Sequence, residues 1–329
     1  MKKLLLGLLA GVTLSSFSGF AQAETTLRLT LQLPLTHPLG QNVASFKEEV
    51  ERETNGEVKI EIFPSAQLFK DKDVPQAVAS GAIEMGVASL TRFVGTVPAV
   101  DAFYVPFLFD SSDKIKAAAA PGSSIRKILD PAIEETGAKP LWYQAFGGAV
   151  VLTKGDKPIV VPEDAKGLKI RSFGATISDT IEAIGAAPTI MSGSKQFLAY
   201  QNGTVDAGMT GITAVQSRKL YEVMDYLTLT NHADIEFIVV INNDVWKALS
   251  DSERAIISKA GKRVEEELRT SIINKENAAR EFLADKIKII ELTDEQRAVW
   301  KKSTASVVKA YVERAGARGQ AIVTEAGKL

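Results

Sequence analysis

The chain has no cysteine and only two histidines among its 329 residues. Without thiols it cannot form disulfides, a thiolate metal site, a cysteine nucleophile or a lipid-modified cysteine. His37 and His232 lie far apart in turn-like segments, which argues against a zinc ion held by several histidines. After residue 23 the chain also lacks glycine-rich phosphate loops and the Gly-x-Ser-x-Gly motif of hydrolases. Acids are plentiful, but no spacing singles out a catalytic pair, so we expect no cofactor, no metal and no enzyme.

The chain also has no excess of basic over acidic residues. The chain has 39 Lys and Arg against 40 Asp and Glu, and two of the lysines lie at its very start. Proteins that bind nucleic acid usually gather a basic excess on one face. We therefore expect no nucleic-acid partner.

Apolar runs are short throughout the chain. The first of them, residues 4–12, follows Lys2 and Lys3 and precedes a small-residue site at 21–23. It is shorter than the about 20 residues that span a bilayer, and this order of features is typical of a secretory signal peptide. The sequence predicts that residues 1–23 are removed by cleavage after Ala23 and that the remaining chain works in the periplasm.

Alternating strand and helix patterns occur twice along the chain. Leucines alternate with polar residues in "TLRLTLQL" (26–33), and helical spacing follows in 41–54. Further strands are expected at 57–63, 82–89, 166–173, 187–191 and 204–211, with helices at 73–81, 176–185 and 194–203. Such alternation favours βαβ units with mainly parallel sheets. Because roughly 305 residues exceed one ordinary domain, two α/β lobes are predicted.

The C-terminal third reads as mostly helical. From Asp244 onward, apolar residues recur at helical spacing, and "SDSE" (250–253) forms a capping box. A short strand at 286–292 and one last long helix at 294–316 follow. These helices are expected to cover the sheets and to join the lobes.

Polar residues stand at the predicted carboxyl ends of strands, where open α/β sheets bind their ligands. Gln32, Ser89 and Arg92 come from the first half of the chain, and Arg171 and Thr210 from the second. A guanidinium offers a planar fork that a carboxylate accepts with both oxygens. A surface salt bridge would explain either arginine equally well on its own. A cleft between two lobes could instead bring all five residues together around an anion.

Several motifs, in this order, resemble the extracytoplasmic substrate-binding proteins of TRAP transporters, the DctP-like family. The resemblance covers essentially the whole chain after residue 23, and the motifs are "FPSAQL", "VPFLF", "KPIVVPEDAKGLKIRS", "GAAPTIM", "NGTVDAG", "RKLYEV" and "YLTLTNH". It implies a two-lobed periplasmic binding protein fold with a long hinge helix, closing over a small organic acid and delivering it to membrane permease subunits driven by a sodium gradient. The implied lobes are 24–147 with about 236–275, and 148–235 with about 276–329. We expect a monomer.

The resemblance also assigns roles to residues. Arg171 falls on the family's principal carboxylate-binding arginine. Gln32, Ser89 and Arg92 fall on first-lobe positions that contact the ligand in the sialic-acid-binding branch. Val150 stands where many members carry a second arginine, which argues against a sialic-acid-like mode of recognition.

Three further residues are candidate ligand contacts near the implied cleft. Phe173 lies two residues after Arg171, and Phe146 precedes the crossing into the second lobe, where it would line an apolar wall or pack in the core. Glu236, near the second crossing, would bind ligand hydroxyls or face solvent. Met209 and Thr210 replace the Glu-Asn pair that many members carry after the corresponding strand.

Two other functions stay open at this point. One is a binding protein for an ATP-driven importer, which the genes next to this one would decide. The other is an exported hydrolase that uses the same cleft, and a pair of acids at the cleft floor would favour it.

Overall fold

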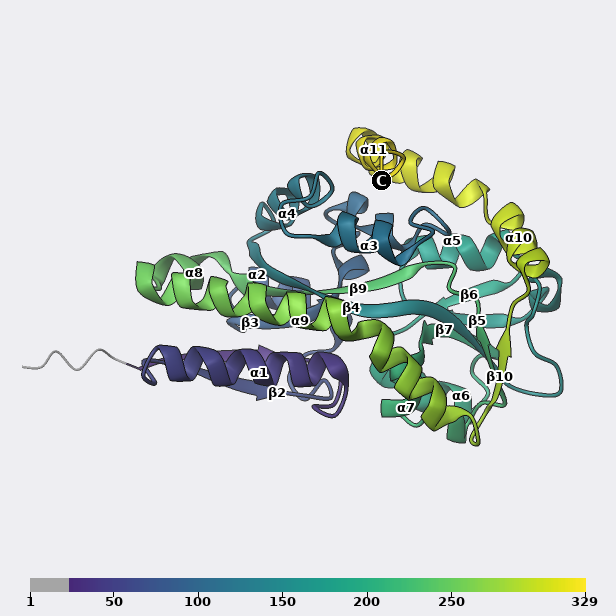
Figure 1. Cartoon of the computed structure of the whole chain (residues 1–329), viewed down its shortest axis with the longest axis horizontal. Helices are drawn as coiled ribbons and strands as arrows, with labels where there is room; N and C mark the ends of the chain where they lie inside the picture. Colours follow the sequence, from purple (N-terminus) through teal and green to yellow (C-terminus); the bar gives the residue numbers. More distant parts are fainter. Residues whose placement is uncertain (1–23) are drawn as a thin grey trace, which may run out of the picture.

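The computed structural model describes residues 24–329, so the predicted signal peptide and its cleavage site lie outside the described residues. Strands and helices alternate along most of the chain, as the sequence predicts (Figure 1). The strands are β1 Thr25–Thr30, β2 Val58–Phe63, β3 Met85–Ser89, β4 Ala138–Thr153, β5 Lys169–Ser172, β6 Ala187–Ile190, β7 Ala207–Gly211, β8 Tyr226–Leu229, β9 Asp234–Asn242 and β10 Lys288–Glu291. The helices are α1 Pro38–Glu53, α2 Val74–Ala79, α3 Ser112–Ala119, α4 Arg126–Glu134, α5 Ala175–Ala183, α6 Gln196–Gln201, α7 Ile212–Ser217, α8 Asn243–Ala248, α9 Asp251–Leu283, α10 Asp294–Ser303 and α11 Ser306–Ala326.

The long strand β4 joins two groups of strands. Its first part pairs with β9 in the order β2-β1-β3-β9-β4, which we call the first half-sheet. Its second part pairs with β7 and β8 in the second half-sheet, which continues through β5 and β6 and includes β10. The register shifts between Ala145 and Gly147, where Gly147 has a φ of 105°, a backbone conformation that favours glycine.

All neighbouring strands other than β4 and β9 are parallel, whereas the crossing strands β4 and β9 are antiparallel to each other and to β3, β7 and β8. The predicted α/β class, with mixed and mainly parallel sheets flanked by helices, is thus confirmed.

The apolar residues that alternate along the predicted strands, or recur at helical spacing, are the ones buried in the structure. Leu27 and Leu29 of β1 and the apolar face of α1 are fully buried in one core. Strand β1 ends three residues earlier than predicted, yet the N–H of Leu31 still donates to the carbonyl of Phe63 at 3.0 Å. The chain therefore stays extended as far as Leu31, and Gln32 comes directly after this extended segment.

Helix α9 is the predicted hinge helix. Ser250 and Glu253 form the predicted capping box at its N-terminus. The helix packs along α1 and β4 and then turns beside α7, so it touches elements of both half-sheets (Figure 1). Within residues 24–329, no helix is long and apolar enough to cross a membrane.

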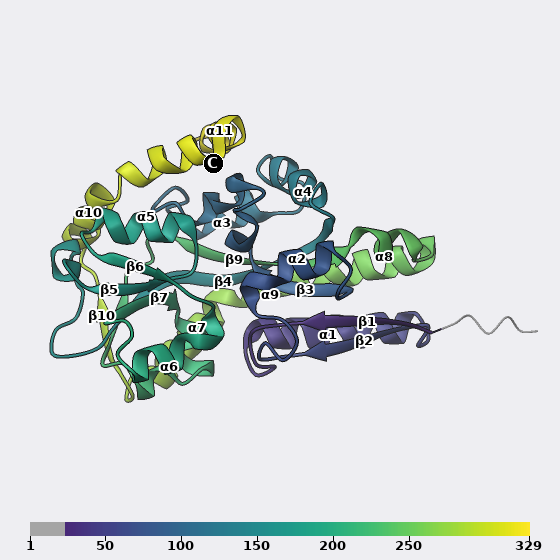
Figure 2. The same ribbon diagram turned by 180° about the vertical axis from the view of Figure 1, so that it is seen from behind.

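The prediction of one last long helix is wrong. The chain forms α10 and α11 instead: α10 ends at its C-cap Thr304, whose φ of −97° and ψ of 4° leave the helical region. Helix α11 continues to residue 326 through a kink at Gly316. It packs on the 3-10 helix η3 (Pro98–Tyr104) and on α5, so it contacts elements of both predicted lobes (Figure 2). The predicted lobe boundaries stay a prediction.

Candidate functional site

A small cavity lies where the carboxyl ends of four parallel strands meet. These are β1 and β3 of the first half-sheet and β5 and β7 of the second, as expected for ligand sites in open α/β sheets. Only about 20 Å³ of the cavity is open to the centre of a water molecule, which is room for about one ordered water and far less than the sites of drug-sized molecules. It is lined by Gln32, Asp71, Ser89, Phe146, Arg171, Phe173, Gly193, Gln196, Thr210, Arg218, Ile235 and Phe237.

Most of the predicted site residues meet at this cavity. Six of the eight predicted residues line it, and a seventh, Arg92, donates a hydrogen bond to the lining residue Asp71. The eighth, Glu236, is not among the lining residues. The six are Gln32, Ser89, Phe146, Arg171, Phe173 and Thr210.

Arg171 is held rigidly by the backbone. Its Nη1 donates to the carbonyl of Met209 at 2.6 Å, and its Nη2 donates to the carbonyl of Met191 at 3.0 Å. The guanidinium carbon lies 5.1 Å from the ring centre of Phe173, within cation–π range. Its Nε is buried without a hydrogen-bond partner among residues 24–329, and the side chain has no acid partner there. Burial lowers the pKa of Arg171 to about 9, so it stays positively charged at neutral pH without a counter-ion.

Arg92, by contrast, is neutralised inside the protein. Its Nε donates to Oδ2 of Asp71 at 2.5 Å, and Oδ1 of the same carboxylate accepts the backbone N–H of Ser89 at 2.9 Å. The pair is almost completely buried, with side-chain exposures of 7% and 1%. Nη2 of Arg92 is buried and has no partner within the described chain. Asp71 therefore fixes Arg92 and Ser89 beside the cavity and offsets one positive charge.

Uncharged groups complete the wall of the cavity. The side-chain oxygen Oε1 of Gln32 is buried with no hydrogen-bond partner in the described residues. The ring of Phe146 stacks between His37 and Phe237, with ring centres 5.1 and 5.0 Å away. Phe146 thus lines the apolar wall, while Trp142, earlier on the same strand, is fully buried in the core.

Direct contacts close the two half-sheets over the cavity. His37, before α1, accepts the N–H of Leu39 at Nδ1, so its Nε2 carries the proton and donates to the hydroxyl of Thr213 in α7 at 3.1 Å. Burial holds the pKa of His37 well below its usual range, which keeps this ring neutral. On another side, Oδ2 of Asp101 in η3 accepts the N–H of Thr176 in α5 at 3.0 Å. The structure is therefore the closed arrangement of the two half-sheets.

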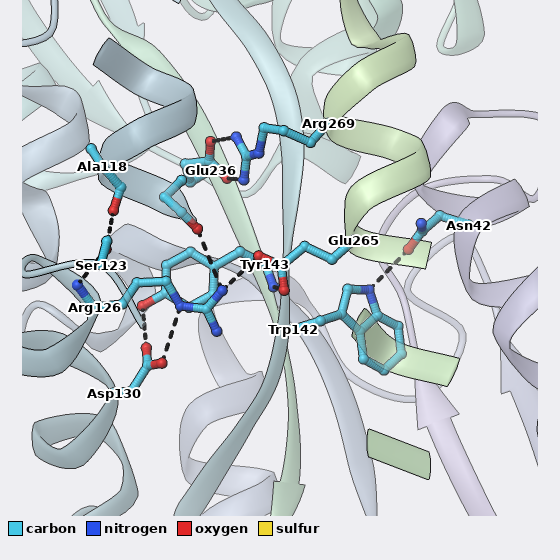
Figure 3. A network of polar contacts seen from close by, with 11 residues as sticks. Asn42, Ala118, Ser123, Arg126, Asp130, Trp142, Tyr143, Glu236, Glu265 and Arg269 are labelled. Carbon is cyan, nitrogen blue, oxygen red and sulfur yellow. Dashed lines mark hydrogen bonds and ion pairs between the residues drawn. The ribbon is translucent and has the colours of Figure 1, made fainter. Parts of the chain in front are cut away.

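Glu236 forms an ion pair with the hinge helix instead of facing the cavity. It is fully buried, and both carboxylate oxygens accept hydrogen bonds from Arg269 of α9, one of them at 2.9 Å (Figure 3). The same region holds a second buried pair between Arg126 and Glu265 (Figure 3). That Glu236 contacts the ligand stays a prediction, and the paired geometry favours a structural role.

The sequence interpretation missed two charged residues of the cavity. Asp71 lies in "DKD", which reads only as a poor calcium loop, and Arg218 lies in "RKLYEV", where no pattern marks it as a site residue. Asp71 is also the only acid among the described lining residues, and Arg92 binds it. The cavity therefore offers no pair of free carboxylates of the kind that a hydrolase would use.

Comparison with known proteins identifies the family. The family model described as bacterial extracellular solute-binding protein, family 7 (DctP), matches residues 30–315. The chain belongs to this family. Its members are solute-binding receptors rather than enzymes.

Individual relatives resemble the chain over most of its length. A C4-dicarboxylate-binding periplasmic protein of Rhodobacter capsulatus is 29% identical, with 98% of each chain covered. A 2,3-diketo-L-gulonate-binding periplasmic protein of Escherichia coli is 30% identical, with 75% of each covered. The crystal structure of a TRAP periplasmic solute-binding protein from Sulfurospirillum deleyianum with bound succinate is 26% identical. It aligns with a TM-score of 0.85 over 93% of this chain and 99% of that one.

Proposed function

We propose that this chain is the periplasmic solute-binding component of a TRAP-type secondary transporter. It captures a small organic acid in the cavity between the half-sheets and delivers it to the membrane permease subunits. The family and the relatives support this function over a binding protein for an ATP-driven importer. Export follows from the predicted signal peptide, with cleavage after Ala23.

This proposal rests on the buried and unpaired positive charge of Arg171. A buried charge is costly unless it is paired, yet this guanidinium has no acid partner within the described chain and is oriented by two backbone carbonyls. Its Nε and remaining N–H groups are donors that suit a carboxylate. The bound acid supplies the missing counter-charge, while Gln32, Ser89, Thr210 and Phe146 surround the rest of the molecule.

Closure follows from the same geometry. The cavity takes walls from both half-sheets, so an acid can contact all of them only when the halves meet. A ligand that binds the closed state better than the open one shifts the population toward closure. The hinge is formed by β4, β9 and the turn in α9.

A thermal-shift screen over organic acids, followed by calorimetric titration of the best acid, tests the proposal. A ligand at 100 times its Kd stabilises the folded state by about 2.7 kcal/mol, which raises the midpoint by several degrees. Arg171→Ala is expected to raise the Kd at least about 30-fold, because a buried carboxylate loses its charged partner. Arg171→Lys keeps the charge but loses the planar fork of the guanidinium. It provides a second test if Arg171→Ala does not fold.

Lys169→Gln is the matched control, since Lys169 is exposed on the same strand. The proposal fails if no organic acid raises the midpoint, or if both Arg171 variants bind the best acid as the wild type does.

A further inference from the structure

Helix α5 begins without a capping side chain of its own. Its N-cap residue is Gly174, which has no side chain to accept a hydrogen bond. The first N–H groups of a helix have no partner inside the helix, and a side-chain oxygen at the N-cap usually accepts the one at the second or third position. Here Oδ2 of Asp101 accepts the N–H of Thr176, the second residue of α5, at 3.0 Å. The first half-sheet therefore supplies the cap of a helix in the second.

The carboxylate of Asp101 depends on this contact. It is fully buried, and its Oδ1 has no hydrogen-bond partner among residues 24–329. Burial raises the pKa of Asp101, whereas the N–H of Thr176 and the charge of Arg314 lower it. Nη2 of Arg314 in α11 lies 4.0 Å from Oδ2 and donates to the hydroxyl of Thr176 at 2.5 Å. Because a buried charge without partners is costly, the carboxylate is stabilised when α5 and Arg314 lie against it.

Tyr104 contacts the same segment at a second point. A 3-10 helix has three residues per turn, so Asp101 and Tyr104 lie on one face of η3. The ring of Tyr104 packs edge to face with that of Phe173, with the ring centres 5.7 Å apart. The hydroxyl of Tyr104 also donates to the carbonyl of Glu236 in β9 at 2.6 Å, which ties η3 to a hinge strand. Both contacts of η3 reach residues 173–176, the segment that directly follows β5.

We propose that Asp101 is a positioning residue for the solute: by capping α5 across the closed halves, it holds residues 173–176, and with them Arg171 and Phe173, in their binding positions. This inference rests on the proposed function, because it assumes that the acid binds to the closed arrangement. Asp101 is not among the lining residues of the cavity, so its effect on the solute passes through α5 and the segment before it. The contact contributes to affinity because it forms only when the halves meet.

Substitutions at Asp101 test this role with the acid that binds most tightly in the thermal-shift screen. Asp101→Ala removes the cap and should raise the Kd by about 5- to 30-fold, as expected for the loss of an N-cap side chain. Stopped-flow measurements should show a faster dissociation and an unchanged association rate, because the contact forms after the acid has entered. Asp101→Asn keeps an oxygen acceptor and should restore most of the affinity, since asparagine caps helices as well as aspartate does.

A purely structural role of Asp101 would give a different result. It would lower the melting temperature of the ligand-free protein and leave the Kd of the folded protein unchanged. Glu182→Ala is the matched control, because it removes an exposed acid from the same helix and should leave the Kd and both rates as they are.

Amide hydrogen exchange of the wild type tests the contact without any substitution. In the open arrangement the N–H of Thr176 has no partner inside α5, because it belongs to the first turn of the helix. Saturating acid should therefore slow its exchange at least about tenfold, whereas the amide of Ile181, further along the helix, should change much less. This measurement decides the case in which Asp101→Ala does not fold.

The outcomes separate the two proposals. The inference is overturned, while the proposed function stands, if Asp101→Ala raises the Kd less than about twofold or if Asp101→Asn binds as weakly as Asp101→Ala. Unchanged exchange at Thr176 in saturating acid would overturn it as well. If no acid of any kind binds, the proposed function fails, and this inference fails with it.

Discussion

Gly174 offers a way to block closure without touching the charged groups of the cavity. It follows β5 in the second half-sheet and faces Thr91 of η2 (Leu90–Phe93) in the first. A β-carbon there would lie 2.1 Å from Oγ1 of Thr91 and 2.9 Å from its Cβ. The φ of Gly174 is −169°, an extended conformation that alanine also adopts. Gly174→Ala therefore leaves the local backbone unstrained but fits only if Thr91 and the surface that carries it move away.

The expected loss of affinity follows from the cost of overpacking. Extra atoms in a well-packed contact cost about 1–3 kcal/mol, and here only the closed state carries this cost. Because the apparent Kd rises as the closed fraction falls, Gly174→Ala should weaken solute binding by about 5- to 150-fold. The melting temperature without ligand should not fall, since the open state is free of the clash.

Calorimetry and small-angle scattering measure the two consequences. At saturating solute the radius of gyration of Gly174→Ala should stay above that of the wild type. Thr91→Gly removes the opposing atoms, so the double variant should regain affinity. Gly95→Ala is the control, because its β-carbon would meet nothing within 4 Å. Wild-type affinity in Gly174→Ala, or no recovery in the double variant, would refute this account of closure.

Two further predictions concern acids near the hinge, the half-buried Glu276 and the fully buried Glu236. Glu276 of α9 accepts the N–H of Gly148 at 2.9 Å, and burial raises its pKa to about 7 against about 4.3 when unfolded. The folded state thus binds the extra proton, so the stabilisation is complete below about pH 4.3 and is lost as the pH rises through 7. Glu276→Gln keeps the hydrogen-bond acceptor without the charge. At pH 8 it should increase the free energy of unfolding by about 1–3 kcal/mol and so raise the melting temperature, whereas at pH 5 the melting temperature should hardly change. An equal effect at both values would contradict this reasoning, and exposed Glu281→Gln is the control. Glu236→Gln breaks the buried pair with Arg269 and should cost about 3–5 kcal/mol in stability. The Kd of the folded variant for the best acid of the thermal-shift screen should change less than about threefold. A tenfold rise in this Kd without loss of stability would instead make Glu236 a solute contact.

The sequence predicted those site residues whose positions depend on local patterns of strands and helices. Alternating apolar residues locate the strands, and the rule for open α/β sheets places Ser89, Arg171 and Thr210 at their carboxyl ends. The helical pattern likewise predicts α9 with its capping box.

What the sequence could not show are contacts between distant segments. Arg218 follows a helix of six residues, and only the fold brings it opposite Gly193 and into the cavity. Glu236 looks like a ligand contact because an acid in a buried strand is unusual, while its partner Arg269 lies 33 residues further along the chain. The end of α10 at Thr304 is a local change of backbone φ and ψ that no apolar period reveals.

The arginines buried at the hinge and at the cavity divide into two groups, and the division explains how a solute could control closure. One group is paired by the protein itself and comprises Arg92 with Asp71, Arg126 with Glu265 and Arg269 with Glu236. The other group, Arg171 and Arg218, faces the cavity between the half-sheets with no acid partner in the described chain. Closing the halves without a ligand removes water from these two cations and leaves a cost of several kcal/mol. An anion of matching charge removes that cost, so the electrostatic balance of the cavity, rather than its apolar wall, is what we expect to couple solute binding to closure.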